Sequence, residues 1–168
     1  MTDRDAATTP DLNRRNLVLG ALGAGAAMAV LTAAAQAGEC PADRAVADSN
    51  LNGPTQGKGV ADAVLTSLDL GGEKVALRGY QLRLRRLVVQ PGGEVPVHSH
   101  QNRPALIYVE SGEMTEFKNL CAAPILHKAG EATPEDHRVV HWWRNTGRVP
   151  AVILSADVFG AGEDAHMM

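Results

Sequence analysis

The sequence predicts an all-β fold, built as a sandwich or a barrel. Short segments in which apolar and polar residues alternate recur from about residue 60 to residue 160, and a period of two is typical of half-buried strands. Turn-forming glycine and asparagine residues separate these segments at regular spacing, as in sandwiches and barrels. No segment after residue 37 shows a long helical period. The length of 168 residues suits about one domain.

The first 37 residues have the features of an export signal. Arg14 and Arg15 precede an uncharged run, Leu17–Ala37, which ends in the small-x-small pattern Ala35-Gln36-Ala37, and this is typical of a cleaved twin-arginine-type signal. About 20 apolar residues also suffice to cross a bilayer, so an uncleaved anchor is the alternative. Because the run is mostly Ala and Gly, we expect cleavage after Ala37, no stable membrane anchor afterwards, and a periplasmic or secreted protein.

Four segments follow from this division of the chain: an export signal at 1–37, an irregular N-terminal arm at 38–59, a barrel at 60–160 and a C-terminal tail at 161–168. The arm holds Cys40, and the barrel holds the second cysteine, Cys121. An oxidising compartment permits one disulfide that closes a loop of about 80 residues. Two unpaired thiols are the alternative, because the sequence does not show whether the two Cα atoms approach within about 7 Å.

The composition argues against a nucleic-acid partner. The net charge is −3, basic residues are scattered, and aromatic residues make up 4% of the chain. A nucleic-acid-binding surface needs a basic stripe with aromatic stacking platforms. A small molecule is the expected partner.

The first barrel strands are predicted between residues 60 and 100. Residues 60–70 form a strand, with a helix as the alternative, and Gly71-Gly72 ends it. Apolar residues from Tyr80 to Leu84 alternate with polar ones, which predicts a half-buried strand that continues to Val89. Arg85-Arg86 breaks this alternation, and a bulge or twist there would keep apolar residues inside on both sides.

Pro91-Gly92-Gly93 predicts a turn, after which residues 95–100 alternate again. Pro96 favours an edge or bulged strand there. Residues 105–110 and 114–117 are expected to form a hairpin across Ser111-Gly112-Glu113. Further strands are predicted at 124–127, 139–143 and 149–159.

Two histidines on the 95–100 strand form half of a metal site. His98 and His100 are two residues apart, so their side chains project from the same face of a strand. The chain after this pair offers four candidates for a third ligand: His127, His137, His141 and His166. We expect His166 to be solvated in the polar tail, whereas His141 follows a predicted strand segment and lies four residues before the turn residue Asn145.

These residues resemble the two motifs of the cupin family. The first motif has a glycine, five residues, His-x-His, three or four residues, a glutamate, six residues and a glycine, and it is matched here by Gly92, His98, His100 and Gly112. The second motif is matched by Gly130, His141 and Asn145. It departs from the family pattern at Asp136, in place of proline, and at Arg138, in place of glycine.

The first motif lacks the glutamate that usually supplies the fourth protein ligand. Its position falls on Ala105, or on Pro104 with the alternative spacing. The resemblance therefore implies a cupin (jelly-roll) barrel that holds a divalent transition metal through His98, His100 and His141 alone. This set looks like the three-histidine cupins, such as thiol dioxygenases and diketone-cleaving dioxygenases, which hold iron. Imidazole ligands suit Fe, Zn, Ni and Cu, and Mn is a further candidate, so the metal's identity stays open.

Nearby side chains offer further roles. Glu94 or Glu110 could replace the missing carboxylate, although solvated charges are the more common state of glutamate. Arg103 is a candidate to bind a substrate carboxylate through two hydrogen bonds. The alternative is that it is a surface residue that caps a turn. If the alternation continues from the histidine pair, Tyr108 faces the same side of the sheet and is a candidate proton donor. The alternative is a tyrosine packed in the core.

The remaining site candidates are polar or aromatic. Gln101 and Asn102 are neutral donors to a metal-bound water. His127 and His137 are interpreted as residues that support a ligand or lie on the surface. Because Trp142 and Trp143 are adjacent on a strand, one is expected to pack inside the barrel and the other outside.

The sequence therefore predicts an exported, metal-binding cupin that acts as a dioxygenase-type oxidoreductase on a small anionic or chelating substrate. A non-catalytic metal or ligand-binding module is the alternative, because this fold hosts many functions. A cupin without metal is a third. The resemblance also allows a homodimer formed through edge strands.

Overall fold

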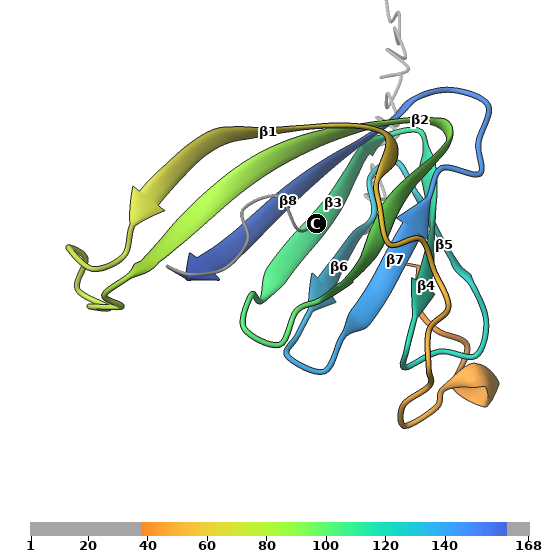
Figure 1. The fold of residues 1–168 in the computed structure, drawn as a ribbon, viewed down its shortest axis with the longest axis horizontal. Helices are drawn as coiled ribbons and strands as arrows, with labels where there is room; N and C mark the ends of the chain where they lie inside the picture. The colour runs from red at the N-terminus through yellow and green to blue at the C-terminus, as the bar shows by residue number, and fades with distance from the viewer. Residues whose placement is uncertain (1–37, 161–168) are drawn as a thin grey trace, which may run out of the picture. The chain divides into compact units, whose positions relative to one another are not determined.

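The computed structural model describes residues 38–160 of the chain, as a barrel of antiparallel strands (Figure 1). The predicted export signal, its cleavage site, the tail and His166 lie outside this range. Within it, no helix is long and apolar enough to span a membrane.

Eight strands and one short helix make up the described chain. Their bounds are η1 Ala42–Arg44, β1 Lys58–Asp69, β2 Tyr80–Ser99, β3 Ala105–Ser111, β4 Glu113–Lys118, β5 Ile125–Lys128, β6 Ala132–Glu135, β7 Val140–Arg144 and β8 Ala151–Gly160. The strands form one sheet in the order β5-β4-β7-β2-β8-β3-β6, with β1 added against β2. This confirms the all-β prediction, and β6 is a strand that the sequence pattern did not reveal.

Strand β2 is the longest strand of the barrel and pairs with three others. Its first half lies between β1 and β8, and its second half pairs with β7. The turn predicted at Pro91-Gly92-Gly93 is wrong: the strand continues through it, and Gly92 absorbs the bend with a φ of +73°. The bulge expected near Pro96 is confirmed by a register shift between Val95 and His98. One bent strand therefore reaches from the open rim at Tyr80 to the histidine pair.

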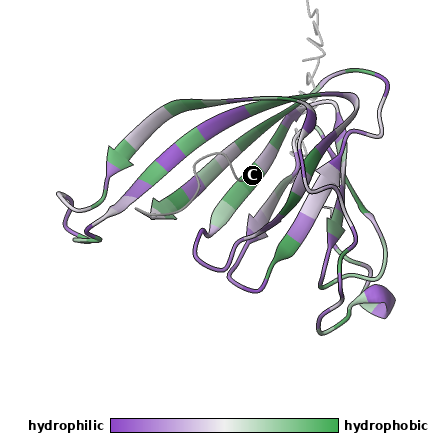
Figure 2. Ribbon diagram, viewed as in Figure 1, coloured by the Kyte–Doolittle hydropathy of each residue, from purple (hydrophilic) through white to green (hydrophobic). Residues whose placement is uncertain are grey.

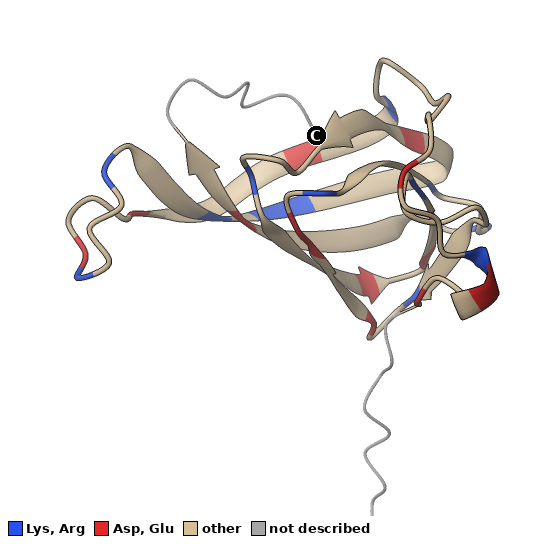
Figure 3. Ribbon diagram, turned by 90° about the horizontal axis from the view of Figure 1, so that it is seen from below, with Lys and Arg blue, Asp and Glu red and all other residues tan. Residues whose placement is uncertain are grey.

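The first half of β2 places arginines inside the barrel, opposite to the expectation. Arg83 and Arg85 are buried, whereas Leu82 is exposed and Leu84 is half-buried, and the alternation runs through Arg85-Arg86 without a break. The guanidinium groups find carboxylates there, since Arg83 pairs with Asp157 of β8. Figures 2 and 3 show the mixed hydropathy of these strands and the charged residues they carry.

The hairpin predicted between β3 and β4 does not form. Strand β3 pairs with β6 and β8, and β4 pairs with β5 and β7. Gly112, with a φ of +76°, redirects the chain between the two sets of strands. A carbon added there would come within 2.9 Å of the Ala151 backbone, so both conformation and space require glycine.

The N-terminal arm is joined to the barrel by the disulfide that the sequence left open. Cys40 and Cys121 are bonded, with their Cα atoms 5.8 Å apart. An isolated antiparallel β-bridge pairs the backbone of Ala45 with that of Cys121. The Val97 amide donates a hydrogen bond to the Pro54 carbonyl at 2.8 Å. The arm is thus part of the fold.

The apolar core fills the interior beside the histidines. It consists of Leu87, Val89, Val95, Ala105, Ile107, Met114, Trp143, Ala151 and Ile153. All except Met114 and Trp143 lie on β2, β3 and β8. The core therefore gives the side chains of His98, His100 and His141 a dry wall on one side.

Candidate metal centre

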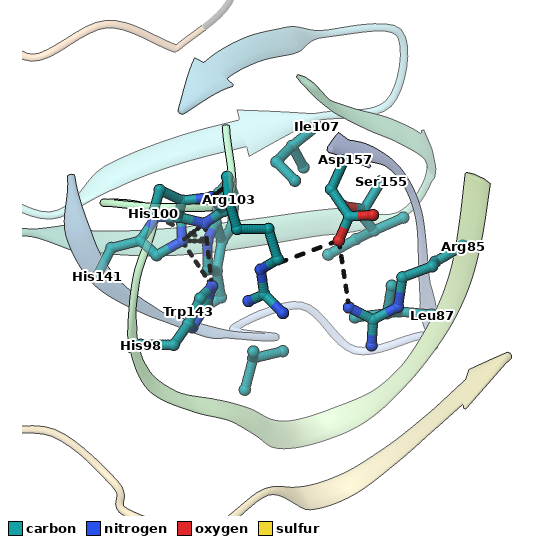
Figure 4. Close-up of a pocket in the computed structure, with 12 residues that line it drawn as sticks. Arg85, Leu87, His98, His100, Arg103, Ile107, His141, Trp143, Ser155 and Asp157 are labelled. Carbon is teal, nitrogen blue, oxygen red and sulfur yellow. Dashed lines mark hydrogen bonds and ion pairs between the residues drawn. The ribbon is translucent and has the colours of Figure 1, made fainter. Parts of the chain in front are cut away.

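Three imidazole nitrogens converge inside the barrel (Figure 4). His98 and His141 are paired across β2 and β7, and His100 follows at the end of β2. The Nε2 atoms are separated by 3.0 Å for His98–His141, 3.0 Å for His100–His141 and 3.2 Å for His98–His100. Nitrogens about 2.1 Å from one metal ion lie roughly 3.0–3.4 Å apart, so these separations suit a shared ion.

The opposite nitrogen of each ring has a partner that sets the tautomer. The Nδ1 atom of His98 lies 2.9 Å from the Pro96 carbonyl, and that of His100 lies 2.8 Å from the Arg103 carbonyl. The Nδ1 atom of His141 lies 2.6 Å from Oε1 of Glu116. Because these oxygens only accept, each Nδ1 carries the proton and each Nε2 presents a lone pair. Three lone pairs that face one another repel unless a cation lies between them.

Burial keeps the three rings neutral. Removal from water lowers the pKa of all three rings. The neighbouring His141 lowers the pKa of His98 and of His100 further, and that of His100 reaches about 3. A metal ligand must be deprotonated, so at neutral pH no proton competes for the site. The three rings, called the three-histidine set below, fit a divalent transition metal.

No carboxylate completes this set within residues 38–160. No further His, Cys, Asp or Glu ligand atom lies within 4.8 Å of all three nitrogens. Ala105 is buried at the position of the missing glutamate. Glu94 lies 3.7 Å from Arg144 and Glu110 lies 3.6 Å from Arg86. The idea that either glutamate replaces the ligand is therefore wrong, since both pair with arginines elsewhere.

A buried polar cluster lies behind His141. Besides the His141 contact, Glu116 accepts from Nε2 of His127 at 3.0 Å and lies 3.2 Å from the Lys118 ammonium. Burial opposes ionisation of Glu116, but hydrogen bonds from both histidines outweigh it and lower its pKa. The sequence reading of His127 as a supporting residue is thus consistent with its place, whereas His137 is exposed.

Glu135 belongs to the same cluster, and its pKa is shifted in the opposite direction. Its carboxylate lies 3.0 Å from Lys118 and 3.7 Å from Nδ1 of His141. Burial, reinforced by the charge of Glu116, raises the pKa of Glu135 to about 8. Two carboxylates of unlike pKa therefore share one ammonium beside a metal ligand.

Aromatic and amide side chains hold the β7 end of the site. Trp143 is buried and packs edge-on against His141, and Trp142 stacks on Phe117 outside, as the alternation predicted. The Asn145 amide donates to the carbonyls of Val89 and Val149 at 2.8 Å each. Asn145 therefore joins β2 to the chain segment that leads into β8.

The pocket beside the three-histidine set has a charged far wall. Its lining is Arg85, Leu87, Val95, His98, His100, Arg103, Ile107, His141, Trp143, Ile153, Ser155 and Asp157, and Figure 4 shows the histidines opposite Arg85 and Asp157. Arg103 is buried within it, so its interpretation as a surface residue is wrong. Arg85, Ser155 and Asp157 were missed. The acidic residue in the otherwise apolar β8 was the one signal that could have pointed to them.

Tyr108 is not part of the site. It is 41% exposed and does not line the pocket, because the buried face of β3 carries Ala105, Ile107 and Val109 instead. Its prediction as a proton donor in the cavity is wrong. Strand β3 pairs with β6 and β8 and not with β2, so the alternation on the histidine strand does not show which face of β3 is buried. Gln101 and Asn102 are also exposed and do not line the pocket.

Comparisons with known proteins agree with this architecture. A family model described as "Cupin domain" matches residues 85–157. The germin-like protein subfamily 2 member 2 of Arabidopsis thaliana is 33% identical over 90 residues, which cover 50% of this chain and 40% of that protein. The chain thus spans less than half of this curated relative.

Solved structures resemble this chain at low identity, and one of the three below reaches a TM-score of 0.50. A predicted oxalate decarboxylase from Thermotoga maritima is 22% identical, with 72% of this chain and 98% of that chain covered and a TM-score of 0.50. The cupin domain of Schizosaccharomyces pombe Cnp3 is 13% identical, with 64% and 67% covered and a TM-score of 0.47. An oxalate oxidase in complex with the substrate analogue glycolate is 23% identical, with 60% and 51% covered and a TM-score of 0.46. These likenesses concern the fold alone.

Proposed function

We propose that this cupin-fold protein is an exported, metal-dependent oxidoreductase of the dioxygenase type that acts on a small anionic or chelating substrate. The observation that carries the proposal is the convergence of three neutral Nε2 atoms within 3.2 Å of one another. Each is aimed by a hydrogen bond on its other nitrogen. No other arrangement in residues 38–160 presents three unprotonated nitrogens to one point.

His98, His100 and His141 would hold a divalent metal there, and such a metal would supply open coordination positions for oxygen or a chelating substrate. The chain's own residues prepare the surroundings. Glu116 holds the His141 ring in one tautomer, and Leu87, Val95 and Ile107 exclude water from one side of the pocket. Because the ligands are neutral, the charge of the metal favours an anionic substrate.

Export rests on the sequence of residues 1–37 and on the disulfide. A Cys40–Cys121 bridge is stable in an oxidising compartment and rare in the cytosol. This supports a periplasmic or secreted protein, as the arginine pair and the cleavage pattern suggest.

A non-catalytic metal or ligand-binding module is the second candidate. The observation in its favour is the lining of the pocket, where Asp157 is the one carboxylate among the described lining residues. Arg83 holds both oxygens of Asp157, at 3.0 and 2.7 Å, so this carboxylate is a poor general base. A site without a free base suits retention of a ligand as well as turnover.

The decisive experiment combines metal analysis with oxygen uptake. We expect about one equivalent of metal in the protein purified without chelator, and a large loss in His100→Ala. The matched control is His137→Ala, which alters an exposed histidine and should retain the metal. Equal metal content in the wild type and His100→Ala would refute the site.

Oxygen consumption with a panel of small enols, thiols and diketones then separates the two candidates. Uptake that His100→Ala abolishes supports the oxidoreductase. A full complement of redox-inert metal with no uptake on any member of the panel supports the binding module.

A further inference from the structure

We propose that Arg85 is the anion anchor of the pocket and that the pocket selects a small carboxylate, held between this guanidinium and the three-histidine set. As a statement about the substrate, this rests on the proposed function. As a statement about a binding site, it stands on the residues of the pocket wall. Arg85 lies on β2, and its side chain is drawn across the pocket from the histidines in Figure 4.

The first observation is a buried guanidinium with an unused donor. Arg85 is 1% exposed, and its Nη2 pairs with Asp62. Its Nη1 is 3.8 Å from Asp157, which exceeds hydrogen-bond distance. Its Nε atom has no hydrogen-bond partner at all. A buried charged donor without an acceptor is costly, so an acceptor brought by a ligand would remove that cost.

The second observation is that the neighbouring carboxylate, Asp157, is already hydrogen-bonded to another arginine. Asp157 receives Nε and Nη2 of Arg83 in a bidentate pair at 3.0 and 2.7 Å. Arg83 itself does not line the pocket; its guanidinium stacks 3.7 Å from the centroid of Phe159. The Arg83 pair thus occupies both oxygens of Asp157, so the Nε donor of Arg85 is not matched by this carboxylate. Arg103 also lines the pocket, with its Nε 3.9 Å from Asp157, and so adds a second positive charge beside the anchor.

The third observation concerns the size and the chemistry of the space. The centre of a water-sized sphere can occupy about 20 Å³ of this cavity, so only a ligand of a few heavy atoms fits. Leu87, Val95 and Ile153 supply apolar walls, so a ligand needs few polar atoms apart from those that meet Arg85 and the metal. A carboxylate matches the geometry and the charge of a guanidinium. The class that fits is a carboxylate of about one to three carbons.

The test uses acetate as the probe and acetamide as its uncharged counterpart. Binding is followed by titration calorimetry and by tryptophan fluorescence, to which Trp143 in the pocket lining and the adjacent Trp142 both contribute. We expect saturable acetate binding to the full-length protein, and acetamide binding at least tenfold weaker. The titration is performed on protein as purified and again after chelator treatment, with metal content measured in both samples.

Arg85→Gln is expected to weaken acetate binding by about tenfold to hundredfold, since a hydrogen bond to a charged group is lost. The matched control is Arg86→Gln, which removes the adjacent guanidinium from the outer face of the same strand, where it lies 3.6 Å from Glu110; it should bind acetate as the wild type does. If Arg85→Gln fails to fold, the double variant Asp62→Asn/Arg85→Gln removes both members of the pair and restores neutrality.

Three results would overturn the inference: no acetate binding to the wild type, unchanged acetate affinity in the Arg85 variants, or equal binding of acetamide. Failure of the proposed function looks different. A wild type that lacks metal but shows acetate binding dependent on Arg85 contradicts the metal site and leaves the anion anchor standing.

Discussion

Glu116 is expected to control the metal affinity of the site, and Glu116→Gln tests this with little change in volume. In the wild type, Oε1 of Glu116 accepts the Nδ1 proton of His141 at 2.6 Å, and an ionised acceptor makes the ring a more basic ligand. The amide keeps an oxygen for this contact and loses the charge. Loss of such a supporting carboxylate typically lowers metal affinity by about 10–100-fold, which corresponds to about 1.4–2.7 kcal/mol.

The variant should still fold, because a second carboxylate lies next to the same lysine. The pKa of Glu135 stands at about 8 through burial and the charge of Glu116. Once residue 116 is neutral, Glu135 ionises more readily and pairs with Lys118 at 3.0 Å. The ammonium therefore does not remain without a counter-charge.

The assay is competition for Zn²⁺ or Co²⁺ against a chromophoric chelator at pH 7. Glu135→Gln is the matched control: most of the Glu135 population carries a proton at that pH, so an amide resembles it and the affinity should change less than threefold. The reasoning is refuted if Glu116→Gln binds metal as tightly as the wild type, or if the two substitutions weaken binding equally.

Three further outcomes follow from the same structure. Metal-free protein should lose stability as pH falls below 6.5, the ordinary histidine pKa, because these histidines bind protons in the unfolded chain but stay neutral when buried in the folded protein. The loss is up to about 1.4 kcal/mol per pH unit for each ring. Equal denaturation midpoints at pH 7.5 and 5.5 would contradict this expectation. Replacing Cys40 and Cys121 together by serine should lower the free energy of unfolding by about 2–5 kcal/mol, measured by urea denaturation. Reducing agent should lower the stability of the wild type but not of the double variant. A double variant as stable as the oxidised wild type would show that the bridge contributes nothing. Asn145→Ala should cost about 1–3 kcal/mol, because it removes the donor from the buried Val89 carbonyl and from the Val149 carbonyl. An unchanged melting temperature would refute that role.

The histidine ligands were predictable because they depend on local geometry. A strand fixes the parity of its side chains, so His98 and His100 had to share a face wherever the strand lay. His141 was identified from its spacing within a resemblance, and the structure brings its Nε2 atom within 3.0 Å of the pair. The absence of a carboxylate at Ala105 was also readable directly from the chain.

What surrounds these ligands could not be read in the same way. The pattern from Tyr80 to Leu84 placed the leucines inside, because alternation shows that two faces differ without showing which one is buried. Asp157, 74 residues after Arg83 along the chain, reverses that choice by pairing with the arginine inside the barrel. Tyr108 was misassigned for a related reason, since parity on one strand carries no information about parity on another until the register is known.

The sequence by itself therefore determined most of the strand content, the three candidate ligand histidines and the absence of a glutamate at Ala105, all of which follow from residue type and short spacing. Only the tertiary structure decided the bridge between Cys40 and Cys121, the support of His141 by Glu116, and the place of Arg85 in the pocket wall. Each of these depends on groups distant in the chain. Their encounter is set by how the strands pair, and strand pairing is a property of the whole sheet.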